Sequence, residues 1–197
     1  MIHPHFRHAP LGLLTLWLAS CAAPKAAPAP ANVRWVATPS ALAALWSDHE
    51  SHGVPSEIGF GGAFGQSVLL LKFPDDWRAR GVPLKAFIAL SPRESAAQAD
   101  PPLELEVWRV EDDWQPLNLR TWSDKPGLAL PRARAPGSVA NGEELRIDVT
   151  ELLRFAAEHP LREFGFAIIG RPSAGHGAHF ATGMSGGRSP RLELYLR

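Results

Sequence analysis

The sequence predicts an all-β fold, a jelly-roll-like antiparallel β-sandwich with one short helix. Apolar and polar residues alternate with a period of two in short runs over much of the chain. Glycine, proline, asparagine and serine separate these runs, as expected for strands joined by turns. Short strands at regular spacing are typical of a sandwich or a jelly roll.

The first residues have the order of a bacterial lipoprotein export signal. Arg7 and nearby histidines precede an apolar core at residues 11–18. This core is too short to cross a bilayer, which takes about 20 apolar residues. The core ends in Leu-Ala-Ser-Cys, and Cys21 is the only cysteine. We therefore expect a signal peptide over residues 1–20 and a diacylglycerol on the Cys21 thiol. The alternatives are an ordinary secretory signal or an N-terminal helix with a chance cysteine.

The residues after Cys21 indicate how the protein is displayed. Ala22 follows the cysteine, which resembles the pattern of lipoproteins passed on to an outer membrane. We therefore expect a lipid-anchored protein of the bacterial cell envelope, at the outer membrane. Residues 21–32 are rich in alanine and proline and predict a tether, and residues 33–197 are enough for a single domain.

The expected strands follow in order after this tether. Residues 66–73 hold consecutive apolar side chains, which predicts burial on both faces of that strand. Residues 103–110 and 192–196 alternate with charged side chains, which predicts one solvated face. The other expected strands cover residues 83–90, 144–149, 163–169 and 178–182.

One helix interrupts this series of strands. Residues 151–159 carry apolar side chains at helical spacing and end before Pro160, and Asp148 or Thr150 can cap the first turn. We expect this helix to act as a lid over one end of the sandwich. Residues 40–46 are ambiguous, because alanine and leucine favour a helix.

The charge balance excludes some classes of partner. The chain has 20 basic and 20 acidic residues, and the two kinds are interspersed. Neither a nucleic-acid footprint nor a polyanion-binding field is apparent from this net charge, so nucleic acid is not an expected partner. With Cys21 lipidated, the mature domain has no disulfide and depends on burial for its stability.

Motifs along the mature chain occur in the order found in a known family. The quoted stretches are 40–46, 52–53, 57–61, 69–73, 84–90, 107–110 with Trp114, 121–126, 148–153, 165–168, 179–182 and 190–195. They include Thr-Trp-x-x-x-Pro at 121–126 and Asp-Val-Thr at 148–150. In this the chain resembles the DNRLRE-type domains, which overlap the family 96 carbohydrate-binding modules. The resemblance implies a strand at residues 40–46 and a module that binds polysaccharide.

The chain also departs from that family at two places. Gly183 and Met184 follow Thr182 where the family usually has a glutamate. Ser51, His52 and Gly53 occupy the turn where an asparagine is usual.

The tryptophans are the candidate carbohydrate-binding residues. Sugars stack their C–H faces on aromatic rings, while polar groups fix their orientation. Trp114 and Trp122 lie in family motifs, so we expect them to pack structurally. The aromatic side chains most free to face a ligand are Trp77, Trp108, Trp46 and Trp35. The alternative is that these tryptophans fill the core, since their large area favours burial.

Three other chemistries have weaker patterns. Asp48, His49, Glu50 and His52, with His176 and His179, could bind zinc, but their spacing is not that of a helical zinc motif. Asp112, Asp113 and Asp124 could supply oxygen ligands to calcium. Ser185 lies in Gly-x-Ser-x-Gly, but no aspartate or histidine follows it, as a hydrolase nucleophile elbow would need.

The sequence therefore predicts no catalytic residues, no metal site and no cofactor. The expected function is a lipid-anchored, non-catalytic β-sandwich that binds polysaccharide. The alternative is a structural or adhesive envelope lipoprotein that binds a protein partner and has no sugar site. An exposed row of aromatic residues favours the first function, and a flat apolar patch favours the second.

Overall fold

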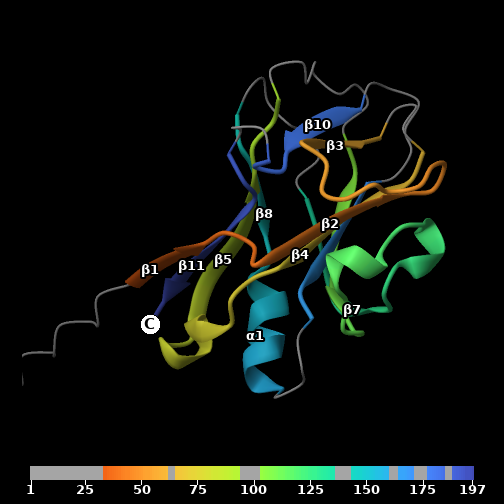
Figure 1. The fold of residues 1–197 in the computed structure, drawn as a ribbon. Coiled ribbons are helices and arrows are strands. Elements are labelled where there is room, and N and C mark those ends of the chain that lie inside the picture. Colours follow the sequence, from red (N-terminus) through yellow and green to blue (C-terminus); the bar gives the residue numbers. More distant parts are fainter. Residues whose placement is uncertain are drawn as a thin grey trace, which may run out of the picture. The chain divides into compact units, whose positions relative to one another are not determined.

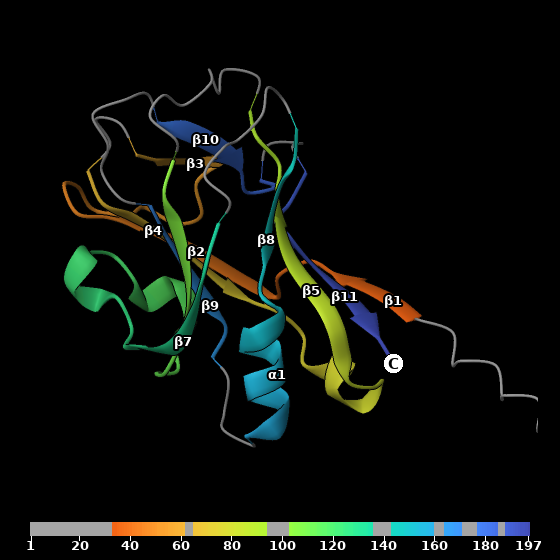
Figure 2. The same ribbon diagram turned by 180° about the vertical axis from the view of Figure 1, so that it is seen from behind.

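Two antiparallel sheets pack face to face around an apolar core (Figures 1 and 2). The computed structural model describes residues 33–61, 65–93, 103–135, 143–159, 164–170, 177–184 and 188–197. Cys21, the tether, His176 and Ser185 lie outside these residues. Residues Ala31–Arg197 cluster as one unit.

The four-stranded sheet has the order β1-β11-β5-β8. Its strands are β1 (Val33–Ala37), β11 (Arg191–Leu196), β5 (Pro83–Leu90) and β8 (Leu145–Asp148). Strands far apart in the sequence pair here, since Val33 lies opposite Leu196. The edges of the sheet are therefore β1 and β8.

The five-stranded sheet has the order β2-β4-β9-β6-β7. Its strands are β2 (Ala41–Trp46), β4 (Ser67–Lys72), β9 (Phe166–Gly170), β6 (Leu105–Val110) and β7 (Leu128–Arg134). A two-stranded sheet, β10 (Ala178–Ala181) with β3 (Glu57–Phe60), lies at one end of the sandwich. The all-β prediction is confirmed.

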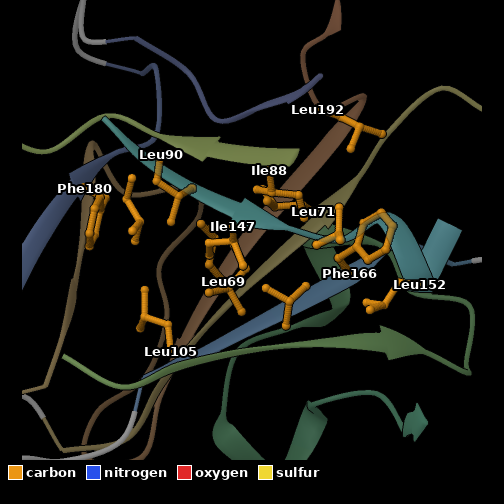
Figure 3. Close-up of a cluster of buried hydrophobic side chains, with 14 of the residues drawn as sticks. Leu69, Leu71, Ile88, Leu90, Leu105, Ile147, Leu152, Phe166, Phe180 and Leu192 are labelled. Carbon is orange, nitrogen blue, oxygen red and sulfur yellow. The ribbon is translucent and has the colours of Figure 1, made fainter. Parts of the chain in front are cut away.

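The main core lies between the two large sheets, and alternate residues of each strand point into it. Figure 3 shows Leu69 and Phe166 of one sheet beside Ile88 and Ile147 of the other. Burial of these side chains is the main favourable contribution to folding, at roughly 25 cal/mol per Å² of apolar surface.

A second apolar cluster lies on the outer side of the five-stranded sheet. Val68 and Leu70 point outward from β4, opposite to Leu69 and Leu71, and all four are fully buried. The prediction that this strand is buried on both faces is therefore confirmed. The covering segment, which we define as residues 111–127, supplies Trp114, Leu119 and Trp122 to this outer cluster. The segment contains two 3₁₀ turns, η2 (Pro116–Asn118) and η3 (Trp122–Asp124).

The helix α1 (Thr150–Glu158) closes the end of the sandwich opposite β3 and β10 (Figures 1 and 2). It contacts β5 of one sheet and β7 of the other, so the predicted lid is confirmed. Leu152, Leu153 and Ala156 form its buried face. Asp148 Oδ1 accepts a hydrogen bond from the Thr150 N–H at 2.9 Å, which satisfies one of the free donors at the helix start.

Four strands refine the sequence predictions. The ambiguous residues 40–46 hold the strand β2, because its side chains are buried against both apolar clusters. The strands β1, β3 and β7 are not among the strands expected from periodicity. β7 contains Pro131, which argues against a central strand, and β7 lies at a sheet edge where proline is tolerated.

Candidate functional site

Trp77 has no free face for a ligand. It lies in the short 3₁₀ turn η1 (Asp76–Ala79), and only 3% of it is exposed. It belongs to the main core between the sheets, and the Arg78 guanidinium lies 5.1 Å from its ring centre. We therefore remove Trp77 from the candidate carbohydrate-binding residues.

Trp35 and Trp46 are half-buried and face the main core from the edge strands β1 and β2. The Trp46 ring stacks on His49, with 4.8 Å between the ring centres and 22° between their planes. Neither residue is fully buried, but both contribute to packing between the sheets. Their side chains therefore offer a ligand only part of a ring.

Trp108 is presented differently from these three. It lies on β6 and faces the outer side of the five-stranded sheet, beside the second apolar cluster and half-buried against it. Trp108 shares the outer phase of its strand with Glu106, but this face is not solvated as the alternation at 103–110 predicts, because Glu106 is buried and the ring packs against the second apolar cluster. A register shift between Trp108 and Arg109 marks an irregularity in the pairing with β7 at this point. Such bulges re-aim side chains and are common at sheet edges near functional sites.

Polar side chains hold the Trp108 ring in place. The Trp108 indole Nε1 donates a hydrogen bond to Glu106 Oε2 at 3.2 Å, and the Arg132 guanidinium lies 4.7 Å from the ring centre. Arg132 and Arg134 approach the Glu106 carboxylate at 3.7 and 3.6 Å. We call Glu106, Trp108, Arg132 and Arg134 the Trp108 cluster. It combines one aromatic ring with charged groups able to bind hydroxyls.

The register places this cluster on neighbouring strands. Arg134 and Arg132 on β7 lie opposite Glu106 and Trp108 on β6. Ile169 lies across from Glu106 on β9. The cluster thus has a regular backbone beneath it, and rigid elements hold a site more precisely than loops do.

The covering segment packs beside this cluster through its own tryptophans. Trp114 is buried, and its Nε1 donates a hydrogen bond to the Phe164 carbonyl oxygen at 2.6 Å. Trp122 packs partly buried against the same apolar cluster, with the Lys125 ammonium 5.8 Å from its ring centre. Both tryptophans therefore have the structural role that the sequence predicts.

A polar cavity of about 500 Å³ lies within the covering segment. Its walls include the three candidate calcium ligands together with Gln115 and Asn118. Asp112 Oδ2 accepts the Gly127 N–H at 2.8 Å, and Asp113 Oδ1 accepts the Trp114 N–H and a Lys72 N–H, both at 3.0 Å. These carboxylates therefore already fix the path of the segment.

Asp124 has the same structural role in this segment. Backbone N–H groups of Thr121 and Arg120 donate to its carboxylate at 2.7 and 3.0 Å. These hydrogen bonds hold the pKa of Asp124 below its ordinary value. The three aspartates lie around one cavity, but their oxygens are directed to the chain itself.

The candidate zinc ligands separate in space. Asp48 Oδ1 and His49 Nδ1 lie 2.7 Å apart on the surface, and Glu50 and His52 line a cavity of about 330 Å³ beside η2. His179 lies 3.3 Å from Glu57 on the two-stranded sheet. Across the residues that the structure describes, no three histidine, cysteine, aspartate or glutamate side chains are placed to hold a metal ion.

The outer face of the four-stranded sheet carries a cluster that sequence reasoning missed. Glu193 is buried, with 2% of its side chain exposed, and three arginines bind it. Arg146 Nη2, Arg191 Nε and Arg34 Nη2 lie 2.6, 2.9 and 3.3 Å from its oxygens. Arg191 also forms a two-pronged ion pair with Glu144. The only sequence signal was the alternation of charged residues along β11.

Two carboxylates on this face, Glu193 and Asp148, have lowered pKa values. Burial alone would raise the pKa of Glu193, but hydrogen bonds and charges from Arg191 and Arg146 outweigh burial and lower that pKa. At Asp148 burial likewise opposes the change, and hydrogen bonds from Thr150 with the charge of Lys85 lower the pKa. Both carboxylates are therefore ionised at neutral pH.

Aromatic rings accompany these charges. Phe87 and Tyr195 meet edge to face with 6.3 Å between their centres, and the Arg146 guanidinium lies 4.3 Å from the Phe87 ring centre. Arg146 also lies 3.5 Å from the Tyr195 hydroxyl. This face thus presents guanidinium groups and aromatic edges together.

No model of a known family matches the chain, and no curated protein matches it. Within the described part of the chain, no helix is both long enough and apolar enough to span a membrane.

Proposed function

We propose that the chain is a lipid-anchored, non-catalytic module of the bacterial cell envelope that binds polysaccharide at the Trp108 cluster. The observation that carries this proposal is the placement of Trp108. Of the four predicted tryptophans, it alone combines an outward-facing ring with a carboxylate and two arginines beside it. The motif resemblance to DNRLRE-type domains is a second argument for a carbohydrate ligand.

The chemistry of the cluster fits a sugar. A pyranose ring presents C–H groups on its faces and hydroxyls around its edge, so it needs an aromatic surface flanked by hydrogen-bonding groups. Trp108 supplies the aromatic surface, and Arg132 adds a planar group stacked on it. Glu106 is buried and holds the Trp108 indole and the two arginines in position, while the exposed Arg132 and Arg134 can donate to sugar hydroxyls. Arg132 and Arg134 are the exposed members of the cluster, on the edge strand β7 beside the covering segment, where an extended polysaccharide could lie along the sheet edge.

The membrane anchor rests on Cys21. Two or three acyl chains on this residue would hold the domain at the membrane, since each buried methylene contributes about 0.8 kcal/mol. The tether of residues 22–32 would then display the domain near the bilayer surface.

Apolar side chains on the surface favour a second function, an adhesive lipoprotein that binds a protein. Leu117 on η2 is 87% exposed and Leu130 on β7 is 67% exposed. Leu117 also borders the cavity beside Glu50 and His52. Exposed leucines of this kind can anchor a protein partner.

A glycan-binding experiment tests the first function. The chain from residue 21 onward, carrying Cys21→Ser, is applied to a glycan array and to affinity gels containing bacterial polysaccharides. Trp108→Ala should weaken binding about tenfold or more, since a buried aromatic contact is often a hot spot of binding energy. Trp108→Phe should keep part of the affinity because an aromatic face remains.

The matched control is Leu117→Ala, which removes an apolar side chain from the covering segment and leaves the Trp108 cluster intact. If Leu117→Ala abolished binding as fully as Trp108→Ala does, the glycan contact would be assigned to the surface around Leu117. Absence of binding to every glycan by a folded protein would overturn the polysaccharide function. Mass spectrometry of the membrane-extracted protein decides separately whether Cys21 carries lipid.

A further inference from the structure

The outer face of the four-stranded sheet carries basic side chains at the protein surface. Arg34 and Tyr195 lie opposite each other, and Lys85 lies on the far side of Tyr195, so the three form one row across β1, β11 and β5. The side chains of Arg34 and Lys85 are 56% and 61% exposed. Arg146 is also exposed, whereas the central carboxylate of Glu193 is buried.

Guanidinium groups on this face have donors left for a ligand. Arg34 directs Nη2 to Glu193, and Arg146 directs Nη2 to Glu193 and Tyr195. A guanidinium has five N–H donors arranged to match the oxygens of a phosphate. Binding Glu193 therefore orients these arginines without exhausting their hydrogen bonds.

The charge of this face differs from that of the opposite side. The four-stranded face and its rim have four basic and three acidic residues, which are Arg34, Lys85, Arg146, Arg191, Glu144, Asp148 and Glu193. The covering segment has two basic and four acidic residues, which are Arg120, Lys125, Glu111, Asp112, Asp113 and Asp124. With Lys72 and the Trp108 cluster the opposite side is balanced, at five basic and five acidic residues, so a negatively charged surface would attract the first side more than the second.

The chain enters the fold at this same sheet. Val33 begins β1, which is an edge strand of the four-stranded sheet and lies at the margin of the molecule in Figures 1 and 2. The eleven residues 22–32 that separate Val33 from Cys21 can span at most about 40 Å. A lipid on Cys21 would therefore keep β1 close to the bilayer. Val36 on the outer face of β1 is exposed and adds an apolar contact.

We propose that the anchored domain lays the outer face of its four-stranded sheet on the anionic phospholipid headgroups of its own membrane. This inference rests on the lipid anchor of the proposed function. Arg34, Lys85 and Arg146 bind headgroup phosphates, and the acidic covering segment and the Trp108 cluster face away from the membrane. The polysaccharide-binding surface is then directed outward from the bilayer.

Vesicle sedimentation tests the docking face without the anchor. The chain from residue 21 onward, with Cys21→Ser, is mixed at low salt with vesicles of 30% phosphatidylglycerol in phosphatidylethanolamine, or with pure phosphatidylcholine. We expect binding to the anionic vesicles alone, with release at high salt, because screening shortens the range of the attraction. Each basic side chain near an anionic bilayer raises partitioning roughly fivefold.

The decisive variant is Arg34→Glu with Lys85→Glu, which reverses two exposed charges and leaves Arg146 and Arg191 on Glu193. It should lower binding to the anionic vesicles about tenfold or more. The matched control is Arg80→Glu with Arg120→Glu, which changes the net charge by the same amount on other exposed positions and should bind nearly as well as the parent. Circular dichroism confirms that each variant is folded.

Three outcomes would overturn the inference. One is equal loss of binding in the two double variants, which would indicate a non-specific charge effect. Another is retention by an anionic polysaccharide with no sedimentation on vesicles, which would assign the arginines to a glycan. The third is a dimer in ultracentrifugation that Arg34→Glu with Lys85→Glu dissociates. Lipid on Cys21 is read independently by mass spectrometry, so failure of the anchor and failure of the docking face are distinguishable.

Discussion

The outer face of the five-stranded sheet is apolar where it lies under the covering segment, with the Trp108 cluster beside it, whereas the outer face of the four-stranded sheet is charged and carries exposed arginines. Val68 and Leu70 on the first face are stabilised by removal from water. Glu193 on the second is stabilised by arginines that compensate for the loss of its hydration. The comparison shows that one sandwich uses packing on one side and ion pairing on the other.

The largest effect should come from removing the main contact of the covered face. Trp114→Ala deletes a buried aromatic side chain and the hydrogen bond to the Phe164 carbonyl. We expect a loss of about 3–5 kcal/mol in the free energy of unfolding, measured by urea denaturation. A loss below about 1 kcal/mol would show that the covering segment contributes little to the stability of this face. Trp122→Ala, at a half-buried ring, should cost less.

A smaller effect should follow on the charged face. Arg191→Ala leaves the buried Glu193 with Arg34 and Arg146, and leaves Glu144 without its two-pronged partner. We expect a loss of about 2 kcal/mol, which is less than for a fully buried pair because Arg191 is partly exposed. Glu193→Gln, an isosteric change, is the companion measurement. An unchanged midpoint in both variants would contradict the role of ion pairing on this face.

The smallest effect is a dependence on pH, which the charged face should show through Glu193 and Asp148, in addition to Asp124 of the covering segment. Folding lowers the pKa of Glu193 and of Asp148, so the unfolded chain takes up protons at a higher pH than the folded chain does. Their contribution is therefore complete above the unfolded pKa values, about 4.3 for glutamate and 3.9 for aspartate, and is lost as the pH falls through the lower folded values.

Urea denaturation between pH 7 and pH 3 measures this dependence. The free energy of unfolding should decrease below about pH 4.5, and the decrease should be shallower in Glu193→Gln. Trp114→Ala should shift the whole profile without changing its slope. Identical slopes in the parent and in Glu193→Gln would show that Glu193 does not contribute to the loss of stability at acid pH.

The sequence contains enough information for most of the elements, but not for the edge strands β1 and β7 or for the way side chains converge. The alternation at 103–110 correctly places Trp108 on the outer phase of its strand, and helical spacing correctly locates α1. Trp77 is different, because Asp75, Asp76 and Arg78 around it suggest a solvated connection. The 3₁₀ turn directs that ring into the core, and this depends on the packing of both sheets.

The arginine cluster shows the same limit more clearly. Arg34, Arg146 and Arg191 each lie on a wet face of a strand, where a charged side chain is ordinarily solvated. Arg34 is 159 positions from Glu193, and Arg146 is 47 positions from it. Only the strand order β1-β11-β5-β8 brings them together, and no local pattern encodes that order.

The strand order also has a consequence for when the domain can fold. β11 lies between β1 and β5, so the four-stranded sheet cannot form until residues 191–196 have joined residues 33–37. Contacts so distant in sequence form slowly, because a long loop must close before they contribute. If the chain is exported through the signal proposed at its start, this delay would leave the four-stranded sheet unformed until nearly all of the polypeptide has crossed the membrane.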